Sequence, residues 1–291
     1  MHIQRGAWAE INLDAVAHNV QMAKANLKPT TKLCAVVKAD AYGHGAVRVA
    51  QEAARNGADF FAVALLQEGV KLREAGIETP ILVLGSMLPE VAEICVRYDI
   101  SHAVFDEERL YALNAAALKL HTKAKIHIKI DTGMHRIGVH VRDAGRFAKL
   151  AASLPGIYIE GVFSHFATAD ADDKQYAAYQ FERFQEALRL IEAEGVHIPI
   201  RHIANSAALT ELQEYQLDMV RQGITLYGLH PAHMIDCYKD FEPVMTVKTQ
   251  VAFVKTLPPG ETIGYGRTYT LTRPSVIATV PIGYADGVSR R

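Results

Sequence analysis

The sequence predicts an α/β protein: a (β/α)8 barrel of the TIM type followed by an incomplete all-β C-terminal domain. Strand-like and helical patterns alternate about eight times over roughly the first 240 residues, which is typical of such a barrel. Apolar, β-branched runs such as residues 33–37 are typical of strands buried on both faces. From about residue 241 the helical period is lost, and Gly and Pro separate short strand-like runs, which indicates an all-β domain.

The expected elements follow one another in a regular order. The strands are expected near residues 32–38, 59–64, 80–84, 101–105, 125–130, 157–164, 200–204 and 217–221. The helices are expected between them, at residues 15–27, 46–56, 67–75, 89–98, 107–120, 143–152, 174–194 and 207–211. Asp14 is placed to cap the first helix. We therefore expect residues 1–13 to form a strand that pairs with the β domain, residues 14–240 to form the barrel and residues 241–291 to form part of the β domain.

A doubly wound sheet is the alternative fold for this alternation of strands and helices. That fold normally carries a glycine-rich dinucleotide fingerprint after its first strand. Here the first strand is followed by Gly43-His44-Gly45, which supplies two glycines and no third. The fingerprint is therefore weak, and the barrel is favoured.

Composition and charge exclude several classes of function. The chain has 291 residues, Lys+Arg 31, Asp+Glu 32 and a formal net charge of −1, so nothing in it attracts nucleic acid or an anionic membrane. Its first residues lack the apolar stretch of a signal peptide. Cys34, Cys95 and Cys237 are widely spaced and odd in number, as in reduced proteins. We expect a cytoplasmic protein with a small-molecule substrate and, without an H-E-x-x-H motif or Cys/His cluster, no metal.

Lys38 is the most informative single residue. It closes the apolar run 33–37 and opens a turn that contains Gly43 and Gly45. A lysine at a strand end can extend its ammonium group to water. Burial instead favours the neutral amine, which is the form that makes Schiff bases. The residues at the other strand ends decide between these two interpretations.

The carboxyl ends of barrel strands carry the chemistry in this fold. Candidate site residues lie at several of these ends. They are Lys38 after the first strand, Lys129 and Arg136 at the fifth, His165 at the sixth, Asn205 and Ser206 at the seventh, and Arg221, Gly223 and Ile224 at the eighth. Ser206 at a helix start, with backbone N–H groups expected to be free at Gly223 and Ile224, suits a phosphate ester. A Schiff-base lysine and a phosphate cradle in one site describe pyridoxal 5′-phosphate, PLP.

Several long motifs resemble those of the alanine racemase family, in the same order along the chain. Residues 37–45, Val-Lys-Ala-Asp-Ala-Tyr-Gly-His-Gly, are similar to the family's cofactor-lysine signature, and residues 129–138, Lys-Ile-Asp-Thr-Gly-Met-His-Arg-Ile-Gly, to its strand-five motif. The shorter matches are Ser164-His165-Phe166, Asn205-Ser206, Arg221-Gln222-Gly223-Ile224 and Gly264-Tyr265-Gly266. The resemblance covers essentially the whole chain. It implies a PLP-dependent racemase that interconverts L-alanine and D-alanine and supplies D-alanine for cell-wall peptidoglycan.

The resemblance also implies a role for each site residue. Lys38 would hold the cofactor and act as one catalytic base. Tyr265 would be the second base, on the opposite face of the substrate α-carbon, and would come from the partner subunit of a head-to-tail homodimer. Arg136 would reach the cofactor's phenolic oxygen and the substrate carboxylate, and Lys129 resembles a lysine that is often carbamylated and orients Arg136. The other implied cofactor contacts are Tyr42, Ser206, Gly223 and Ile224 at the phosphate, Asn205 beside them, His165 against the ring and Arg221 at the pyridine nitrogen.

The choice of Arg221 for that last position has a chemical consequence. An arginine is effectively always protonated, so it can only donate to the ring nitrogen, which then stays unprotonated. The ring withdraws electrons less strongly in that form, which favours return of a proton to the α-carbon over transamination. This argues against a barrel-type PLP decarboxylase, because enzymes of that type tend to place an acidic residue at this position.

The C-terminal residues bear on two further expectations. A PLP-carrier protein built from the barrel alone is the non-enzymatic alternative, although residues 241–291 begin a second domain that such carriers lack. The family's β domain also continues past the point where this chain ends. We therefore expect the chain to lack the part that supplies a further tyrosine to the phosphate and strands to the dimer interface. The preference for alanine over serine is not encoded in any motif that we recognise.

Overall fold

The computed structural model describes residues 6–231 and 239–289, and the chain divides into two compact units. Residues 12–244 form one unit, and the N-terminal segment up to Ile11 joins residues from Met245 onward in the other. Cys237 lies outside the described residues, whereas Cys34 and Cys95 are buried thiols. Among the helices within the described residues, none combines the length and the apolar character needed to cross a bilayer.

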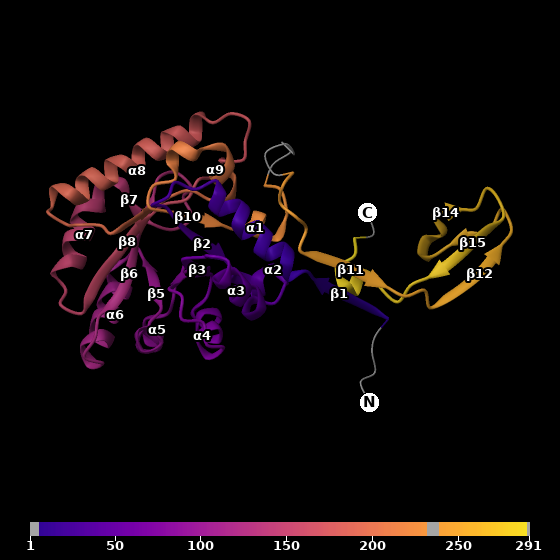
Figure 1. The fold of residues 1–291 in the computed structure, drawn as a ribbon, viewed down its shortest axis with the longest axis horizontal. Helices are drawn as coiled ribbons and strands as arrows, with labels where there is room; N and C mark the ends of the chain where they lie inside the picture. Colours follow the sequence, from indigo (N-terminus) through magenta and orange to yellow (C-terminus); the bar gives the residue numbers. More distant parts are fainter. Residues whose placement is uncertain (1–5, 232–238, 290–291) are drawn as a thin grey trace. The chain divides into compact units, whose positions relative to one another are not determined.

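The larger unit is built on a parallel sheet that curls into a barrel (Figure 1). Within the described residues its strands, in order around the sheet, are β10 (Met219–Gln222), β2 (Lys32–Val36), β3 (Phe60–Val63), β4 (Ile81–Val83), β5 (Ser101–Val104), β6 (Ala124–Asp131), β8 (Ile157–Phe163) and β9 (Ile200–His202). Backbone hydrogen bonds from Asp218 N to Arg201 O and from Arg221 N to Ala204 O, each 3.1 Å long, join β9 to β10 and nearly close the barrel. The predicted barrel and the all-β second part are both confirmed.

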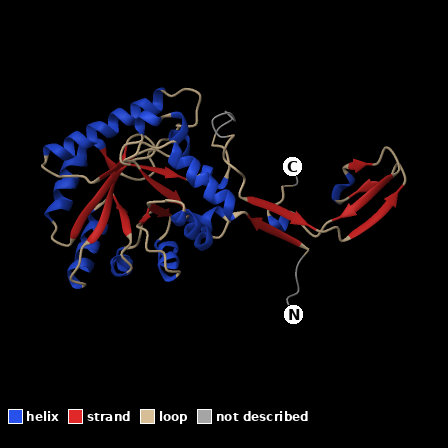
Figure 2. Ribbon diagram, viewed as in Figure 1, coloured by secondary structure: helices blue, strands red, loops and turns tan. Residues whose placement is uncertain are grey.

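Helices follow most of the strands and lie outside them in Figure 2. They are α1 (Leu13–Ala25), α3 (Ala46–Arg55), α4 (Leu66–Glu74), α5 (Ala92–Arg97), α6 (Glu107–Lys119), α7 (Ala144–Ser153), α8 (Gln175–Ala193) and α9 (Ser206–Glu211), with a short β7 (Val139–His140) beside β6. The predicted cap of the first helix was wrong. Asn12, not Asp14, is the N-cap, because its side-chain oxygen accepts from the backbone N–H groups of Asp14 and Ala15 at 3.0 and 3.2 Å.

The segment after β2 has an unusual backbone that sequence propensity did not predict. In α2 (Lys38–Tyr42) the residues Ala39, Asp40, Ala41 and Tyr42 all have φ between 51° and 56°, so the turn is left-handed. Each L-residue in this conformation costs roughly 1–2 kcal/mol. Contacts of the turn offset that cost: Asp40 Oδ1 accepts from Ala46 N at 3.1 Å, and Glu68 Oε1 accepts from Ala39 N at 2.6 Å.

The smaller unit is all-β within the described residues. β1 (Ala7–Ile11) pairs antiparallel with β11 (Met245–Thr249), β12 (Phe253–Leu257) with β15 (Ser275–Thr279), and β13 (Thr262–Ile263) with β14 (Tyr269–Thr270). A short 3₁₀ turn, Tyr265–Arg267, lies between β13 and β14. The glycines on either side of Tyr265 both have positive φ, 71° at Gly264 and 76° at Gly266, which only glycine adopts at little cost.

Candidate functional site

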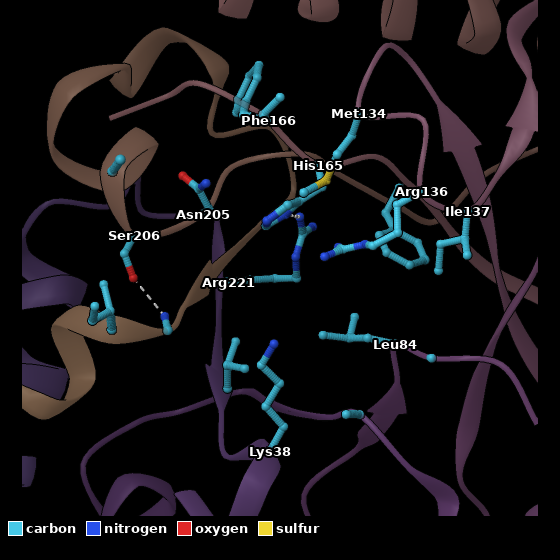
Figure 3. A pocket seen from close by; sticks show the side chains of 18 of the residues that line it. Lys38, Leu84, Met134, Arg136, Ile137, His165, Phe166, Asn205, Ser206 and Arg221 are labelled. Atoms are coloured by element: carbon cyan, nitrogen blue, oxygen red, sulfur yellow. Dashed lines mark hydrogen bonds between the residues drawn. The ribbon is translucent and has the colours of Figure 1, made fainter. Parts of the chain in front are cut away.

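A cavity of about 590 Å³ lies in the barrel unit, where the loops after several strands meet. Its lining includes most of the residues that the sequence singled out: Lys38, Tyr42, Lys129, Arg136, His165, Asn205, Ser206, Arg221, Gly223 and Ile224. Figure 3 shows Lys38 extending its amine toward Arg221, with Ser206 on one side of the cavity and Arg136 on the other. The fold therefore brings these residues into one site.

The loops after β9 and β10 form a small polar cradle. Ser206 Oγ accepts from Gly223 N at 2.8 Å and from Thr225 Oγ1 at 3.2 Å (Figure 3). Because the serine oxygen accepts from these groups, its own O–H remains able to donate into the cavity. A Cβ at position 223 would lie 3.7 Å from both Ser206 Oγ and the Tyr42 hydroxyl, so glycine keeps the cradle open. The expectation that Gly223 N would have no protein partner was wrong, since Ser206 accepts from it.

Asn205 helps to position Ser206 in this cradle. It is the N-cap of α9, and its side-chain oxygen accepts from Ala208 N at 3.1 Å. The cap begins the helix at Ser206, so the serine hydroxyl is fixed at the helix start. Tyr42 is the other wall: its ring packs 5.0 Å from the buried ring of Tyr227, whose hydroxyl donates to Val36 O at 2.8 Å. Burial raises the pKa of Tyr42, which therefore stays a neutral donor.

Arg221 is the central cation of the site and is almost entirely buried. Its Nη2 lies 2.8 Å from Ser164 O, 3.0 Å from Ile203 O and 2.9 Å from His165 Nδ1, and its Nη1 lies 2.7 Å from His202 Nδ1. Burial lowers the pKa of Arg221 to about 10, so the guanidinium is charged at neutral pH. Within residues 6–231 and 239–289, its Nε has no hydrogen-bond partner, so this N–H group is able to donate to a ligand.

Burial and the charge of Arg221 lower the pKa values of two neighbouring groups, Lys129 and His165. Burial first, and then the charge of Arg221, lowers the pKa of Lys129 to about 7. The Lys129 amine donates to Ile130 O at 3.0 Å and lies 5.2 Å from the centre of the Phe163 ring. Burial and Arg221 likewise lower the pKa of His165 well below its usual value, so this histidine is neutral. The site thus holds one buried cation, Arg221, beside buried groups that are wholly or partly neutral.

Two further predicted site residues are Arg136 and Tyr265. Arg136 lines the cavity but is exposed to solvent, which suits an arginine that receives an anionic group. Tyr265 belongs to the smaller unit rather than to the barrel and is 81% exposed. The barrel therefore assembles every predicted site residue except the proposed second base.

Some residues at the site were missed by the sequence reasoning. Tyr227 and Thr225 support the cradle, and His202 contacts Arg221. His202 lies on β9 and is fully buried. The available signal was the alternation of side chains along a strand, which places His202 on the same face as the buried Ile200 and opposite the exposed Arg201. Tyr227 and Thr225 lie in a short 3₁₀ turn and carry no comparable signal.

The residues present fit PLP. The cradle offers a serine O–H at the start of α9, a tyrosine O–H and an open glycine position, which suit a phosphate group. Arg221 offers a donor without an acceptor, which suits an unprotonated ring nitrogen. Lys38 provides the amine that such a cofactor binds covalently. These three features lie around a single cavity.

Comparisons with known proteins agree with this site. The family model described as "Alanine racemase, N-terminal domain" matches residues 11–231, and "Alanine racemase, C-terminal domain" matches residues 244–291. The chain is 46% identical to an alanine racemase of Desulfovibrio desulfuricans over 98% of this chain and 77% of that protein. It is also 46% identical to an alanine racemase of Halothermothrix orenii over 99% of this chain and 76% of that protein.

Solved structures show the same likeness. The alanine racemase of Clostridium difficile 630 superposes with a TM-score of 0.93 at 40% identity, over 99% of this chain and 76% of that chain. That of Bacillus anthracis, solved with bound L-Ala-P, superposes with a TM-score of 0.90 at 38% identity, over 99% of this chain and 75% of that chain.

The fold and the comparisons define a barrel enzyme of the amino-acid isomerase class, with a second all-β unit. More specifically, the chain belongs to the alanine racemase family.

Proposed function

We propose that this chain interconverts L-alanine and D-alanine with PLP held on Lys38. The observation that supports this most strongly is that Lys38 and the cradle made by Ser206 and Gly223 line one cavity together with Arg221. The cradle would hold the phosphate and Arg221 Nε would donate to the ring nitrogen. Tyr42, Asn205 and Ile224 would complete the phosphate end, and His165 would lie against the ring.

The proposed chemistry is a proton transfer at the substrate α-carbon. When bound, the cofactor withdraws electrons from that carbon, which makes its hydrogen acidic. The substrate amine would take the place of Lys38 on the cofactor, and the amine of Lys38 that is released would take or return the proton on one face. The hydroxyl of Tyr265 does so on the other, because one fixed side chain does not easily reach both faces of a planar carbon. Arg136 binds the substrate carboxylate, since its guanidinium can pair with a carboxylate in bidentate geometry.

We also propose that Lys129 is carbamylated. A neutral amine adds to CO2 and releases one proton, and burial beside Arg221 keeps much of Lys129 neutral at pH 7. The carbamate would place an anion among Arg221, Arg136 and Lys38. Incubation with ¹³C-labelled bicarbonate should give a carbamate carbon signal that disappears in Lys129→Met. A signal that persists in this variant would assign the carbamate elsewhere.

The family resemblance supports three wider proposals: a head-to-tail homodimer, a cytoplasmic location and a role in supplying D-alanine for peptidoglycan. None of the charge or composition features of the chain favours nucleic acid or membrane as a partner. Sedimentation at several protein concentrations tests the dimer.

The decisive experiment is an absorbance spectrum of the PLP-loaded protein followed by chiral analysis of products from L-alanine. We expect a yellow protein that forms D-alanine, and Lys38→Ala should abolish both properties. Ethylamine instead of D-alanine would indicate the decarboxylase. A yellow protein that turns over neither alanine nor serine would indicate a carrier and contradict the proposal.

A further inference from the structure

A line of hydrogen-bonded side chains leads from Arg221 away from the cavity and through the barrel interior. Arg221 Nη1 lies 2.7 Å from His202 Nδ1, and His202 Nε2 lies 2.9 Å from His127 Nδ1. His127 Nε2 lies 3.0 Å from Glu160 Oε2, to which the hydroxyl of Ser101 also donates at 2.5 Å. We call His202, His127 and Glu160 the interior relay. They come from β9, β6 and β8, and Ser101 is the first residue of β5.

The two ends of the interior relay allow only one arrangement of its protons. Arg221 carries donors and no acceptor, so His202 Nδ1 must accept and its proton must lie on Nε2. His202 therefore donates to His127 Nδ1, and the proton of His127 must also lie on Nε2. That proton is donated to Glu160, whose carboxylate only accepts. Both histidines are thus assigned as neutral Nε2–H tautomers from their partners.

The surroundings of the interior relay support this assignment. The side chains of His127 and His202 are 0% exposed, and the ring of Phe163 stacks on His202 at 4.9 Å. Burial, and then the charge of Arg221, lowers the pKa of His202 well below its usual value. Glu160 Oε2 accepts from the His127 ring at 3.0 Å and from the Ser101 hydroxyl at 2.5 Å, and two such donors favour the charged form of a carboxyl group. The carboxylate is therefore ionised and accepts.

The backbone is built to make the contact between His127 and Glu160. In the pairing of β6 with β8, Ile126 faces Ile159 and His127 faces Gly161, so Glu160 is the extra residue of a β-bulge. Bulges redirect a side chain that a regular strand would point elsewhere. A Cβ at Gly161 would lie 2.5 Å from His127 Nδ1, so only glycine leaves room for this ring. The bulge and the glycine both serve the same hydrogen bond.

The interior relay cannot carry protons into the site. A proton wire needs every member to accept and donate in turn, and Arg221 has no acceptor position. The interior relay can instead fix the direction in which its hydrogen bonds are donated. If His127 carried its proton on Nδ1, the proton of His202 would move to Nδ1 and oppose the donor of Arg221. Glu160, as an acceptor at the far end, excludes that arrangement.

We propose that Glu160 and His127 are positioning residues for the racemase site, which act through His202 to hold the guanidinium of Arg221 in place. This inference rests on the proposed function, because Arg221 Nε is the donor that the cofactor's ring nitrogen would meet. It assigns a positioning role to residues of the barrel interior that do not line the cavity.

The test is ¹⁵N NMR of the histidine rings in the PLP-loaded protein near neutral pH, with His127→Gln and His202→Asn used for assignment. We expect neutral Nε2–H tautomers at both positions. An imidazolium or an Nδ1–H tautomer at either position would overturn the proposal. This part of the test keeps Glu160 in place, so it does not depend on whether a Glu160 variant folds. Glu160→Gln keeps the shape but offers both a donor and an acceptor, so we expect mixed tautomers at His127 and His202.

Glu160→Gln should also lower kcat for alanine by about 10-fold while leaving KM nearly unchanged. Such a loss is typical when a residue that hydrogen-bonds to a site residue from outside the site is replaced. Glu52→Gln is the matched control: Glu52 is also partly buried and hydrogen-bonded, but lies on α3 away from the relay. It should change neither the tautomers nor kcat. Unchanged tautomers and kcat in Glu160→Gln would contradict the proposal. Correct tautomers in a protein that does not racemise alanine would instead contradict the proposed function.

Discussion

At the scale of single residues, the site is governed by one buried cation and its effect on its neighbours. Arg221 keeps its charge because four acceptor groups surround its terminal nitrogens. Lys129 and His165 cannot add a second and third buried charge without large desolvation costs. The pKa values of both are lowered for that reason.

Lys129 should make the stability of the protein depend on pH in a specific direction. Between its pKa of about 7 in the folded state and its ordinary value of 10.5, the unfolded chain binds more protons than the folded one. Stability from this group therefore rises with pH across that window. In CO2-free buffer, Lys129→Met should raise the free energy of unfolding near pH 7 by on the order of a few kcal/mol, and this gain should vanish toward pH 10.5. Urea unfolding at several pH values measures it, and parallel pH profiles for the two proteins would contradict the account.

Ser206 should control the affinity for the cofactor. Ser206→Ala removes the hydroxyl donor and leaves Gly223 N–H without its 2.8 Å acceptor. A lost hydrogen bond to a charged group costs roughly 1.5–3 kcal/mol, so we expect the Kd for PLP to rise by roughly 10-fold to 100-fold. Spectrophotometric titration of the cofactor-free protein measures this. Ser153→Ala, which removes an exposed hydroxyl bonded to Leu150 O, should leave the Kd unchanged.

The residue scale also shows what a sequence can reveal. Lys38, Ser206 and Arg221 could be predicted because each ends or follows a recognisable strand. The partners of Arg221 could not, because they depend on which strands become neighbours around the barrel. His127 and Glu160 meet only through a bulge in β8, and a bulge leaves no clear sequence signal.

At the scale of elements, the left-handed turn of α2 is the most demanding feature. It places Lys38 at its start and Tyr42 at its end, so both lie on the cavity wall. Position and length of the surrounding strands and helices could be predicted from periodicity. The handedness of this turn could not, because Ala, Asp and Tyr in sequence favour a right-handed helix.

Replacing alanine by glycine lowers the stability of a regular helix, but it should not do so in this left-handed turn. Ala39 is exposed with φ 51°, a conformation that glycine adopts without cost. Ala39→Gly should therefore leave stability unchanged or raise it by up to about 1 kcal/mol. The control Ala115→Gly, at an exposed position in the middle of the regular helix α6, should lower it by about 1 kcal/mol. Urea unfolding of both variants measures the difference, and equal losses in the two would argue against a left-handed turn.

At the scale of the whole molecule, the residues proposed to act in catalysis are divided between the two units of the chain. Every proposed cofactor contact lies in the barrel unit, whereas Tyr265 lies in the all-β unit. The order of motifs predicted both units. It could not predict how Tyr265 reaches a substrate, because that depends on how units and subunits associate.

Tyr265 should therefore matter for only one direction of proton transfer. In Tyr265→Phe, α-hydrogen exchange of L-alanine in deuterated solvent should be lost, while D-alanine still exchanges through Lys38. Proton NMR of the α-hydrogen follows both reactions in the same sample. Equal slowing of the two enantiomers would refute the assignment of two bases.

The proposed function requires that Lys38, and no other lysine, carries the cofactor. Borohydride reduction of the PLP-loaded protein fixes the bond between the cofactor and its lysine, and peptide mass mapping then identifies that lysine. The account predicts a single modified peptide that contains Lys38, and no such peptide from Lys38→Ala. A cofactor found on Lys129 or on any other lysine, with Lys38 unmodified, would contradict it.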